Sequence, residues 1–329
     1  MSASLGDSAA PVWVLADPRA GTAAQALGVA ERLAERHGIA HRVVPLAWGP
    51  LARLPWPVPT MAGLAPEARA AFAPPWPRLA ISAGRRSAPV SRWLRARGVR
   101  TVHLMRPGGP FGASDFDLLA VGRHDAPRPA PNLVEIVGAC HRLSPARLAA
   151  ARAEWEAALS VFPAPRVALL LGGPVRAEGL DAETAARLPG RALARFPGAS
   201  LLASTSRRTG APATGALRRA LAEAAPGRHL LYAWGDPGPN PYAGFLAWAD
   251  AVVVTGDSVS MISEALATPA PVLIATREAR RHGRLADSLY GPGLAAPLDG
   301  DGRPGPRPPL DEAVRVAGEV AARGFLGHR

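Results

Sequence analysis

The sequence contains no lysine, one cysteine and no long apolar run, and each absence excludes a class of protein or site. Because Cys140 is alone, there can be no internal disulfide and no cluster of cysteine ligands; this fits a reducing compartment, and we expect a cytoplasmic protein. No stretch approaches the roughly 20 apolar residues of a membrane span, so any membrane contact is expected to be peripheral, at the inner face. The opening stretch MSASLGDSAAPVWVLA lacks a basic region followed by a long apolar core, and we expect no signal peptide.

Since lysine is absent, all 38 basic residues are arginines; they exceed the 26 acidic residues and give a net charge of +12. Arginine is suited to two-pronged contacts with phosphates. Such a charge can serve nucleic acid, an anionic membrane surface or a phosphorylated ligand. No nucleic-acid module with interleaved aromatic residues is visible, so we expect no nucleic-acid partner. No group of metal-ligating residues is visible either, and we predict no metal.

Hydropathy divides the chain into two tandem halves, in which short apolar runs alternate with amphipathic stretches. The 329 residues, 48% of them apolar, suffice for two cores. The alternation restarts at the markedly apolar run Arg166–Leu171 and predicts an α/β fold with parallel sheets. We predict a first domain over residues 1–160, a second over residues 161–309 after a proline-containing linker at Val161–Pro165, and a carboxyl-terminal helix and tail over residues 310–329.

The stretch Ala251–Ala275, AVVVTGDSVSMISEALATPAPVLIA, contains the clearest chemistry. An apolar run, a polar turn, a helical segment and a second apolar run predict a βαβ unit. In the turn, Gly256 permits a sharp bend, and either Asp257 or Ser258 can cap the helix. The helix start therefore presents free N–H groups and a positive dipole end, which suit a phosphate.

Two further residues of this helix extend the hypothesis. Ser260 lies in the first turn, and Glu264 follows about a turn and a half from the start. From that position Glu264 could accept hydrogen bonds from a ribose diol, as an acidic residue does in dinucleotide sites. The alternative is an exposed glutamate on an ordinary capped helix.

The words TGDSVSMISEA resemble the family named for a plant mitochondrial-fission (elongated mitochondria) protein, and the wider stretch resembles the nucleotide-sugar half-site of GT-B glycosyltransferases. The resemblance implies two Rossmann-like doubly wound domains in a GT-B arrangement with an interdomain cleft. It also implies that Glu264 binds a ribose. The residues that would contact a diphosphate are those of the turn and of the first helical turn, namely Gly256, Asp257, Ser258, Ser260 and Met261.

Other words in the second half support the same resemblance. Gly172 and Gly173 follow the first strand of the second half, where GT-B enzymes place a glycine-rich loop beside the donor diphosphate. The word Ser206–Thr209, including Arg207 and Arg208, resembles a family word, and its hydroxyl and guanidinium groups suit a pyrophosphate. Its alternative is an exposed basic turn. Asn240 opens a shared Asn-Pro-Tyr word, in a turn that could hold the nucleotide base.

The first half matches the family less completely. The family opens with Asp-Gly-x-x-Gly-His-x-x-Gln, of which Asp17, Gly21 and Gln25 remain. Thr22 stands where the family has histidine, the candidate base for an acceptor hydroxyl, and a threonine hydroxyl does not titrate near neutrality. The usual catalytic residue is thus missing.

Two other pairs in the first half are candidates for function. His124 and Asp125 match a family His-Asp word after a strand, and the candidate bases are therefore Asp17, His124 or Asp125. The alternative for His124 and Asp125 is a structural loop pair. Arg85 and Arg86, in the family-like words SAGRRSAPVSRWLR, could meet phosphate or form a solvated surface pair.

The resemblance implies a metal-independent GT-B glycosyltransferase, since arginines and helix starts can stabilise a leaving diphosphate. The donor, a nucleoside-diphosphate sugar, would be a substrate rather than a cofactor. The acceptor would be a lipid-linked or envelope glycan at an anionic membrane surface. The alternatives are a sugar-nucleotide epimerase on the same architecture and a membrane-associated scaffold without catalysis, which the plant name suggests.

Overall fold

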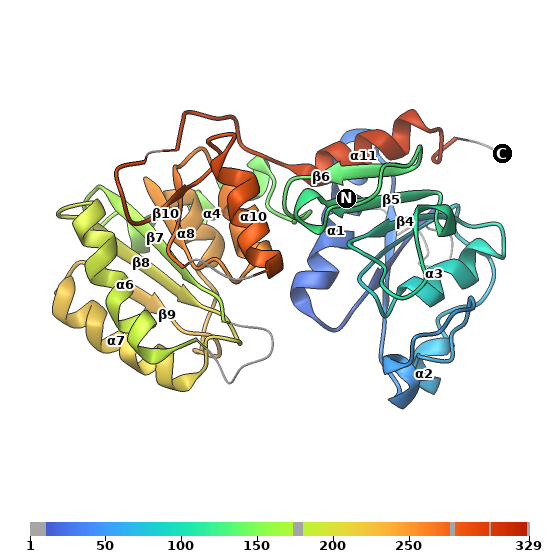
Figure 1. Ribbon diagram of the computed structural model, residues 1–329, viewed down its shortest axis with the longest axis horizontal. Helices are drawn as coiled ribbons and strands as arrows, with labels where there is room; N and C mark the ends of the chain where they lie inside the picture. Colours follow the sequence, from blue (N-terminus) through green and yellow to red (C-terminus); the bar gives the residue numbers. More distant parts are fainter. Residues whose placement is uncertain (1–10, 174–179, 277–279, 303, 328–329) are drawn as a thin grey trace. The chain divides into compact units, whose positions relative to one another are not determined.

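The computed structural model describes residues 11–173, 180–276, 280–302 and 304–327. Most of the opening stretch in which no signal peptide is expected, residues 1–10, lies outside this range. The chain forms two compact units: unit 1 runs up to Arg142 and resumes at Asp311, and unit 2 spans Leu143–Leu310. Each unit contains a six-stranded sheet whose strand pairs are all parallel, with helices packed against it (Figure 1). The predicted fold class, two Rossmann-like α/β domains, is confirmed.

Unit 1 has the strand order β2-β1-β3-β4-β5-β6. Its strands are β1 Val12–Ala16, β2 His41–Pro45, β3 Leu79–Ala83, β4 Arg100–Leu104, β5 Leu118–Gly122 and β6 Leu133–Ile136. Its helices are α1 Ala20–His37, α2 Pro66–Arg69, α3 Ala88–Arg95 and α11 Glu312–Ala322, with single 3₁₀ turns η1 Pro50–Arg53, η2 Ala113–Asp115 and η3 Arg123–Asp125.

Both faces of the first sheet are covered, which explains why the strands β1, β3 and β5 are almost continuously apolar. Successive side chains of β1 point to opposite faces: Val12 and Val14 pack with α1 and α11, whereas Trp13 and Leu15 pack with α2 and α3. The helix α11, the last in the chain, thereby belongs to the core of unit 1.

Polar contacts also attach the carboxyl-terminal segment to unit 1. The buried Arg32 donates from Nε to Asp311 Oδ2 at 2.7 Å, and Glu312 Oε1 accepts from the backbone N–H of Val137 at 2.9 Å. Asp311 also caps α11 by accepting from the N–H groups of Ala313 and Val314. A single carboxylate therefore links α1 to the start of α11 across 279 residues of sequence.

Unit 2 has the strand order β12-β11-β10-β7-β8-β9. Its strands are β7 Arg166–Leu171, β8 Ser200–Thr205, β9 His229–Tyr232, β10 Ala251–Val254, β11 Val272–Ile274 and β12 Ala296–Pro297. Its helices are α4 Pro145–Glu154, α5 Glu156–Leu159, α6 Ala182–Arg195, α7 Ala211–Ala224, α8 Tyr242–Trp248, α9 Val259–Leu266 and α10 Arg280–Tyr290.

The helix α6 continues without interruption through Pro189, a residue that by itself favours a break in a helix. A proline in a helix removes one backbone hydrogen bond and clashes with the preceding turn. Here the buried side chains Ala185, Leu188 and Ala192 pack with β7 and α7 in one core. That packing stabilises the helical conformation on both sides of the proline.

The boundaries between the units differ from those predicted at residues 160 and 309. Residues Leu143–Ser160 belong to unit 2, because α4 and α5 pack against α8. The ring of Trp155 lies so close to Gly244 that a Cβ atom there would be 2.6 Å from Trp155 Cδ1. Trp248 Nε1 donates to the carbonyl of Arg152 at 2.9 Å, and the guanidinium of Arg152 lies over the same Trp248 ring. The predicted linker Val161–Pro165 therefore lies inside unit 2.

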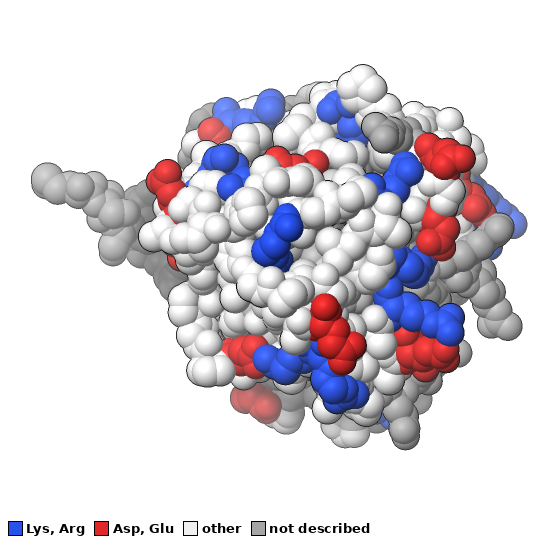
Figure 2. All heavy atoms as spheres, turned by 90° about the vertical axis from the view of Figure 1, so that its left-hand side faces the viewer, with Lys and Arg blue, Asp and Glu red and all other residues white. Residues whose placement is uncertain are grey.

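Charges of both signs are interspersed on the face of unit 2 that includes α6 and α7 (Figure 2). On α6, Arg187 pairs with Glu183, and Arg191 pairs with Asp299 at 2.7 Å. Two of the arginines of α6 are therefore paired with acidic residues. Among the described residues, no helix is both long and apolar enough to cross a membrane.

Candidate functional site

The edge of the second sheet at which its strands end gathers most of the predicted donor residues. The chain begins this sheet at β7, moves outward through β8 and β9, and then returns to the other side of β7 as β10. In open α/β sheets, ligands bind where the strand order reverses in this way, at the carboxyl ends of the strands. Gly172 and Gly173 follow β7, and Thr255–Ser258 follows β10, so both segments lie at the reversal. Ser206–Thr209 follows the neighbouring strand β8.

The three segments are in contact with one another through atoms that leave no room for side chains. Gly172 donates its N–H to Thr255 Oγ1 at 2.8 Å. A Cβ atom on Gly172 would lie 2.7 Å from Asp257 Oδ1, and one on Gly173 would lie 2.0 Å from the carbonyl oxygen of Arg208. Glycine is therefore required at both positions, and the backbone of the turn stays accessible to close approach by a ligand.

The structure decides which residue caps α9. Ser258 is the N-cap, and its Oγ accepts from the N–H of Met261 at 3.4 Å. Asp257, the other candidate, instead lies beside Gly172, with only 2% of its surface exposed. Neither of its carboxylate oxygens has a hydrogen-bond partner among the described residues. A buried carboxylate without a partner is costly, so Asp257 is an acceptor available to a ligand hydroxyl or amide.

Within the word Ser206–Thr209 the residues divide into two roles. Thr209 is buried; its Oγ1 donates to the carbonyl oxygen of Gly172 at 2.6 Å and accepts from the N–H of Ser206 at 2.9 Å. Thr209 therefore holds the loop against β7. Arg207 is exposed and Arg208 half-buried, and neither guanidinium forms a hydrogen bond or ion pair within the described part of the chain. These two cations are available to an anion.

Glu264 has a partner that the sequence reasoning missed. The hydroxyl of Tyr242 donates to Glu264 Oε2 at 2.7 Å. Burial raises the pKa of Glu264 to about 7, and the hydrogen bond from Tyr242 acts in the opposite direction. Asn240 Oδ1 accepts from the N–H of Tyr242 at 3.0 Å, so the Asn-Pro-Tyr turn is fixed beside Glu264. The signal for Tyr242 was present in that word, but its pairing with Glu264 depends on tertiary structure.

In unit 1 the strand order reverses between β1 and β3. Asp17, directly after β1, is buried; its Oδ1 accepts from the N–H of Arg19 at 2.8 Å and its Oδ2 from Trp48 Nε1 at 3.0 Å. Both oxygens thus hold the loop. Thr22 lies in the first turn of α1, not in the loop, and a Cβ on Gly84, after β3, would lie 3.2 Å from its methyl group.

The other candidate bases, His124 and Asp125, lie elsewhere on the same edge of the sheet. His124 and Asp125 form η3 after β5, are 3% and 8% exposed, and their Nε2 and Oδ2 atoms are 4.0 Å apart. The strand β5 lies three positions from β1 in the sheet. Since neighbouring strands are about 4.8 Å apart, Asp17 and this pair are separated by roughly 14 Å. The structure therefore does not bring the two candidates together, and one reacting hydroxyl cannot contact both.

Comparisons with known proteins bear on the whole chain. The sequence profile described as mitochondrial fission ELM1 matches residues 20–323. Mitochondrial fission protein ELM1 of Arabidopsis thaliana is 28% identical over 299 residues, which cover 80% of this chain and 68% of that protein.

Among solved structures, the fold is similar to that of the UDP-GlcNAc 2-epimerase from Neisseria meningitidis bound to UDP-GlcNAc, with a TM-score of 0.50, 9% identity and coverage of 95% of this chain and 91% of that one. MurG from Acinetobacter baumannii aligns with a TM-score of 0.46, 14% identity and coverage of 95% and 90%. At such identity the likeness to the epimerase concerns the fold alone.

Proposed function

The chain belongs to the mitochondrial fission ELM1 family, and from this membership and the geometry of unit 2 we propose that it is a GT-B-type glycosyltransferase with a nucleoside-diphosphate-sugar donor. The observation that carries the proposal is the convergence of three features where the second sheet reverses its strand order. They are two obligatory glycines, two arginines that have no partner among the described residues, and the start of α9. Each of these features suits a phosphate for an independent reason.

In this proposal the diphosphate lies against the turn after β7 and the start of α9. The guanidinium groups of Arg207 and Arg208 neutralise the charge that develops on the leaving diphosphate, which lowers the barrier to transfer without requiring a metal. Ser206 directly follows β8, and Ser260 and Met261 lie in the first turn of α9. Glu264 accepts hydrogen bonds from the ribose, and Asp257 accepts one from a ligand hydroxyl.

The acceptor, its base and the location of the protein form the finer part of the proposal. The acceptor is a lipid-linked or envelope glycan, and the protein works in the cytoplasm, at the inner face of an anionic membrane. His124 or Asp125 takes the acceptor proton, because both oxygens of Asp17 are already engaged by Arg19 and Trp48. Sedimentation with anionic vesicles tests the location: retention of the protein in the supernatant contradicts it.

An epimerase is the second candidate, since the similar solved structure with the TM-score of 0.50 is an epimerase bound to UDP-GlcNAc. Such an enzyme would use the same donor site but would invert a centre of the sugar without an acceptor. Product analysis separates the two: an epimer formed from the nucleotide sugar alone identifies an epimerase, and release of the nucleoside diphosphate that depends on an added acceptor identifies a transferase.

The donor site is tested by thermal denaturation with a panel of nucleotides and nucleotide sugars that begins with UDP-GlcNAc. A ligand that binds only the folded protein stabilises it by about 2.7 kcal/mol at one hundred times its dissociation constant. We expect a clear rise of Tm with at least one nucleotide sugar. If every member of the panel leaves Tm unchanged, the chain is better described as a scaffold without a donor site.

A further inference from the structure

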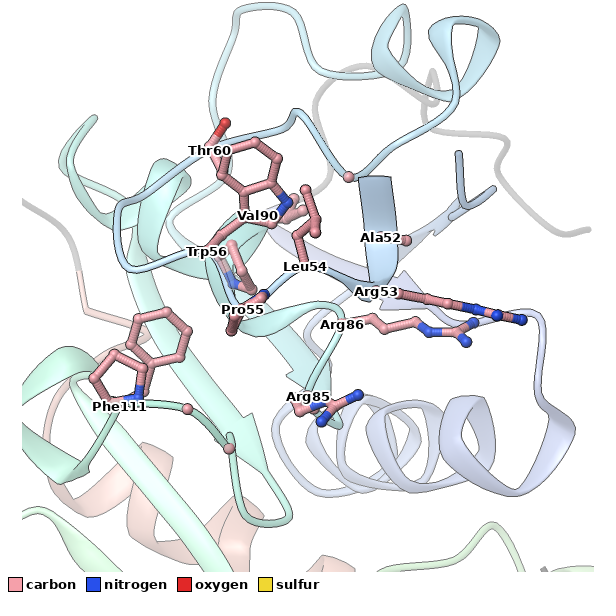
Figure 3. A pocket seen from close by; sticks show the side chains of 15 residues that line it. Ala52, Arg53, Leu54, Pro55, Trp56, Thr60, Arg85, Arg86, Val90 and Phe111 are labelled. Carbon is pink, nitrogen blue, oxygen red and sulfur yellow. The ribbon is translucent and has the colours of Figure 1, made fainter. Parts of the chain in front are cut away.

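A hollow of about 110 Å³ lies in unit 1, beside the segment that follows β3, and the proposed donor site does not include it (Figure 3). Three arginines line it: Arg53 comes from η1, and Arg85 and Arg86 follow β3. Figure 3 shows their guanidinium groups on one side and the rings of Trp56 and Phe111 on the other. The wall is thus cationic on one side and aromatic on the other.

The arginines of this wall are not balanced by acidic groups. Within the described part of the chain, the guanidinium groups of Arg53, Arg85 and Arg86 form no hydrogen bond and no ion pair. Burial lowers the pKa of Arg86, and the nearby charge of Arg19 lowers it further; Asp17 acts in the opposite direction, and Arg53 and Arg85 add to the lowering. Asp17 is already paired with Arg19 and Trp48, so the cluster keeps a net positive charge that an anion would neutralise.

At least one of these arginines is held in place by the backbone. Gly108 has a φ of +74°, and a Cβ atom there would lie 2.6 Å from Cδ of Arg85. The side chain of Arg85 therefore lies directly against residue 108, where only glycine fits. A cation positioned in this way loses less conformational entropy when it binds an anion than a freely rotating surface arginine does.

The opposite wall is apolar and unusually open to solvent. Leu54 lines the hollow and is 50% exposed, and Leu51 and Val58 of the same loop are 43% and 54% exposed. Trp56 is half-buried, and its Nε1 donates to the carbonyl of Leu51 at 3.0 Å, which keeps the polar edge of the indole occupied. Leu51, Leu54 and Val58 therefore expose apolar surface on the segment of chain that also carries Arg53.

The size of the hollow limits its occupant. An engineered apolar cavity of about 150 Å³ holds one benzene molecule. The hollow of about 110 Å³ is smaller, so it admits a phosphate group or the first few carbons of a chain, not a whole nucleotide. The remainder of a ligand would extend over the exposed loop.

We propose that this hollow binds an amphiphile in which a phosphate or diphosphate is attached to an apolar chain, with the phosphate on Arg53, Arg85 and Arg86 and the chain against Leu54, Trp56 and Phe111. A free phosphate uses only the arginines, and an uncharged chain uses only the apolar wall; the juxtaposition favours a molecule with both parts. The site lies in unit 1 and is assayed without a nucleotide sugar, so its failure and the failure of the donor site are distinguishable.

Calorimetric titration of the full chain with three probes tests the proposal: geranyl diphosphate, inorganic pyrophosphate and geraniol. We expect geranyl diphosphate to bind at least tenfold more tightly than either of the others, because it alone contacts both walls. Equal affinities for geranyl diphosphate and pyrophosphate overturn the apolar part of the proposal. Absence of saturable binding of geranyl diphosphate overturns it entirely.

Variants locate the binding within unit 1. The double variant Arg53→Gln with Arg86→Gln is expected to lower the affinity for geranyl diphosphate and for pyrophosphate by at least tenfold. Trp56→Ala is expected to lower the affinity for geranyl diphosphate and to leave the affinity for pyrophosphate unchanged. The matched control is Arg78→Gln, since Arg78 is exposed, precedes β3 and lies at the opposite end of that strand. Equal losses in the control and the double variant, at unchanged Tm, overturn the assignment to this hollow.

Discussion

The two units share one architecture but differ in how the strands follow one another. Counted from the first strand of each unit, the order is 2-1-3-4-5-6 in unit 1 and 6-5-4-1-2-3 in unit 2. Each order has one reversal beside the first strand, and both reversals carry functional candidates. In unit 2 that edge consists of glycine turns whose backbone lies directly against neighbouring turns and hydrogen-bonds to a hydroxyl group. In unit 1 the nearby wall consists of arginine side chains opposite aromatic rings.

This difference indicates that the architecture determines where a ligand site lies, while the local residues determine what binds there. Glycine turns, which carry no side chains, suit a ligand that must approach the backbone closely and be held rigidly. Long arginine side chains suit an anion of less defined geometry, and the adjacent apolar loop suits a chain. The comparison is therefore consistent with our two proposals, a nucleotide site in unit 2 and an amphiphile site in unit 1.

The largest effect is expected on turnover, from the candidate bases of unit 1. Either His124→Ala or Asp125→Asn should lower the turnover by about 10²–10⁴-fold, the usual contribution of a general base. The substrate for this assay is whichever nucleotide sugar raises Tm. Thr22→His should change the turnover little, because the base then lies elsewhere on the edge. Steady-state kinetics of all three variants, with donor affinity measured separately, decides the matter. Full activity of both the His124 and the Asp125 variant contradicts the assignment.

The next largest effect concerns the stability of each unit. Gly173→Ala in unit 2 should lower the free energy of unfolding by about 3 kcal/mol or more, because the new Cβ would lie 2.0 Å from a backbone carbonyl oxygen. Gly28→Ala should do the same in unit 1, where the corresponding distance to the His141 carbonyl oxygen is 2.2 Å.

The control for both is Gly190→Ala in α6, where no described atom outside the adjacent backbone of the helix lies within 4 Å of the new Cβ. Since alanine favours a helix over glycine by up to about 1 kcal/mol, this variant should be slightly stabilised. Denaturant unfolding of the three variants provides the measurement. A Gly173→Ala protein as stable as the control is not compatible with the tight contact between the turns after β7 and β8.

A smaller effect is expected from the cations of unit 2. Arg207→Ala and Arg208→Ala should each lower the affinity for a nucleoside diphosphate by about tenfold or more, because hydrogen bonds to charged groups contribute about 1.5–3 kcal/mol. The affinity for the nucleoside should stay the same, since only the phosphates contact the guanidinium groups. Arg218→Ala, an exposed arginine of α7, is the matched control. Equal losses for nucleoside and nucleoside diphosphate would place the two arginines elsewhere.

The smallest effect is expected on the pH dependence of ligand binding to unit 2. Because burial raises the pKa of Glu264 to about 7, the carboxylate forms only as the pH rises through 7, and the affinity for a ribose-containing ligand should increase several-fold between pH 6 and 8. Glu264→Gln should abolish this increase with little change in fold. Calorimetry at both pH values measures it, and an unchanged pH profile in the variant removes Glu264 from the site.

The same pKa predicts the sign of a change in stability. The pKa of Glu264 lies above its ordinary value of 4.5, so the folded protein retains a proton that the unfolded chain releases between pH 4.5 and 7. The free energy of unfolding should therefore fall as the pH rises through this window, and Glu264→Gln should lessen that fall.

Much of the local structure could be predicted from the sequence. The strands Val12–Ala16, Arg166–Leu171 and Ala251–Val254 have the bounds that their apolar runs predict. A parallel strand covered on both faces is apolar throughout, so its signal is strong and local. The words around Gly172, Arg207 and Ser258 could likewise be placed after strands, because turn and cap residues follow directly in the sequence.

The sequence by itself determined the succession of strands, turns and helices, the two-domain α/β class and which words follow the strands at the proposed donor edge, since each depends on neighbours a few positions away. Tertiary structure alone decided that Tyr242 meets Glu264, that Asp17 and His124 lie apart, and that Arg53 joins Arg85 and Arg86. It also decided that the boundary lies at Arg142, where packing of α4 on α8 outweighs the proline-rich segment that follows. The reason is physical: hydropathy periods report which face of an element is buried, whereas the order of strands in a sheet decides which distant residues meet there.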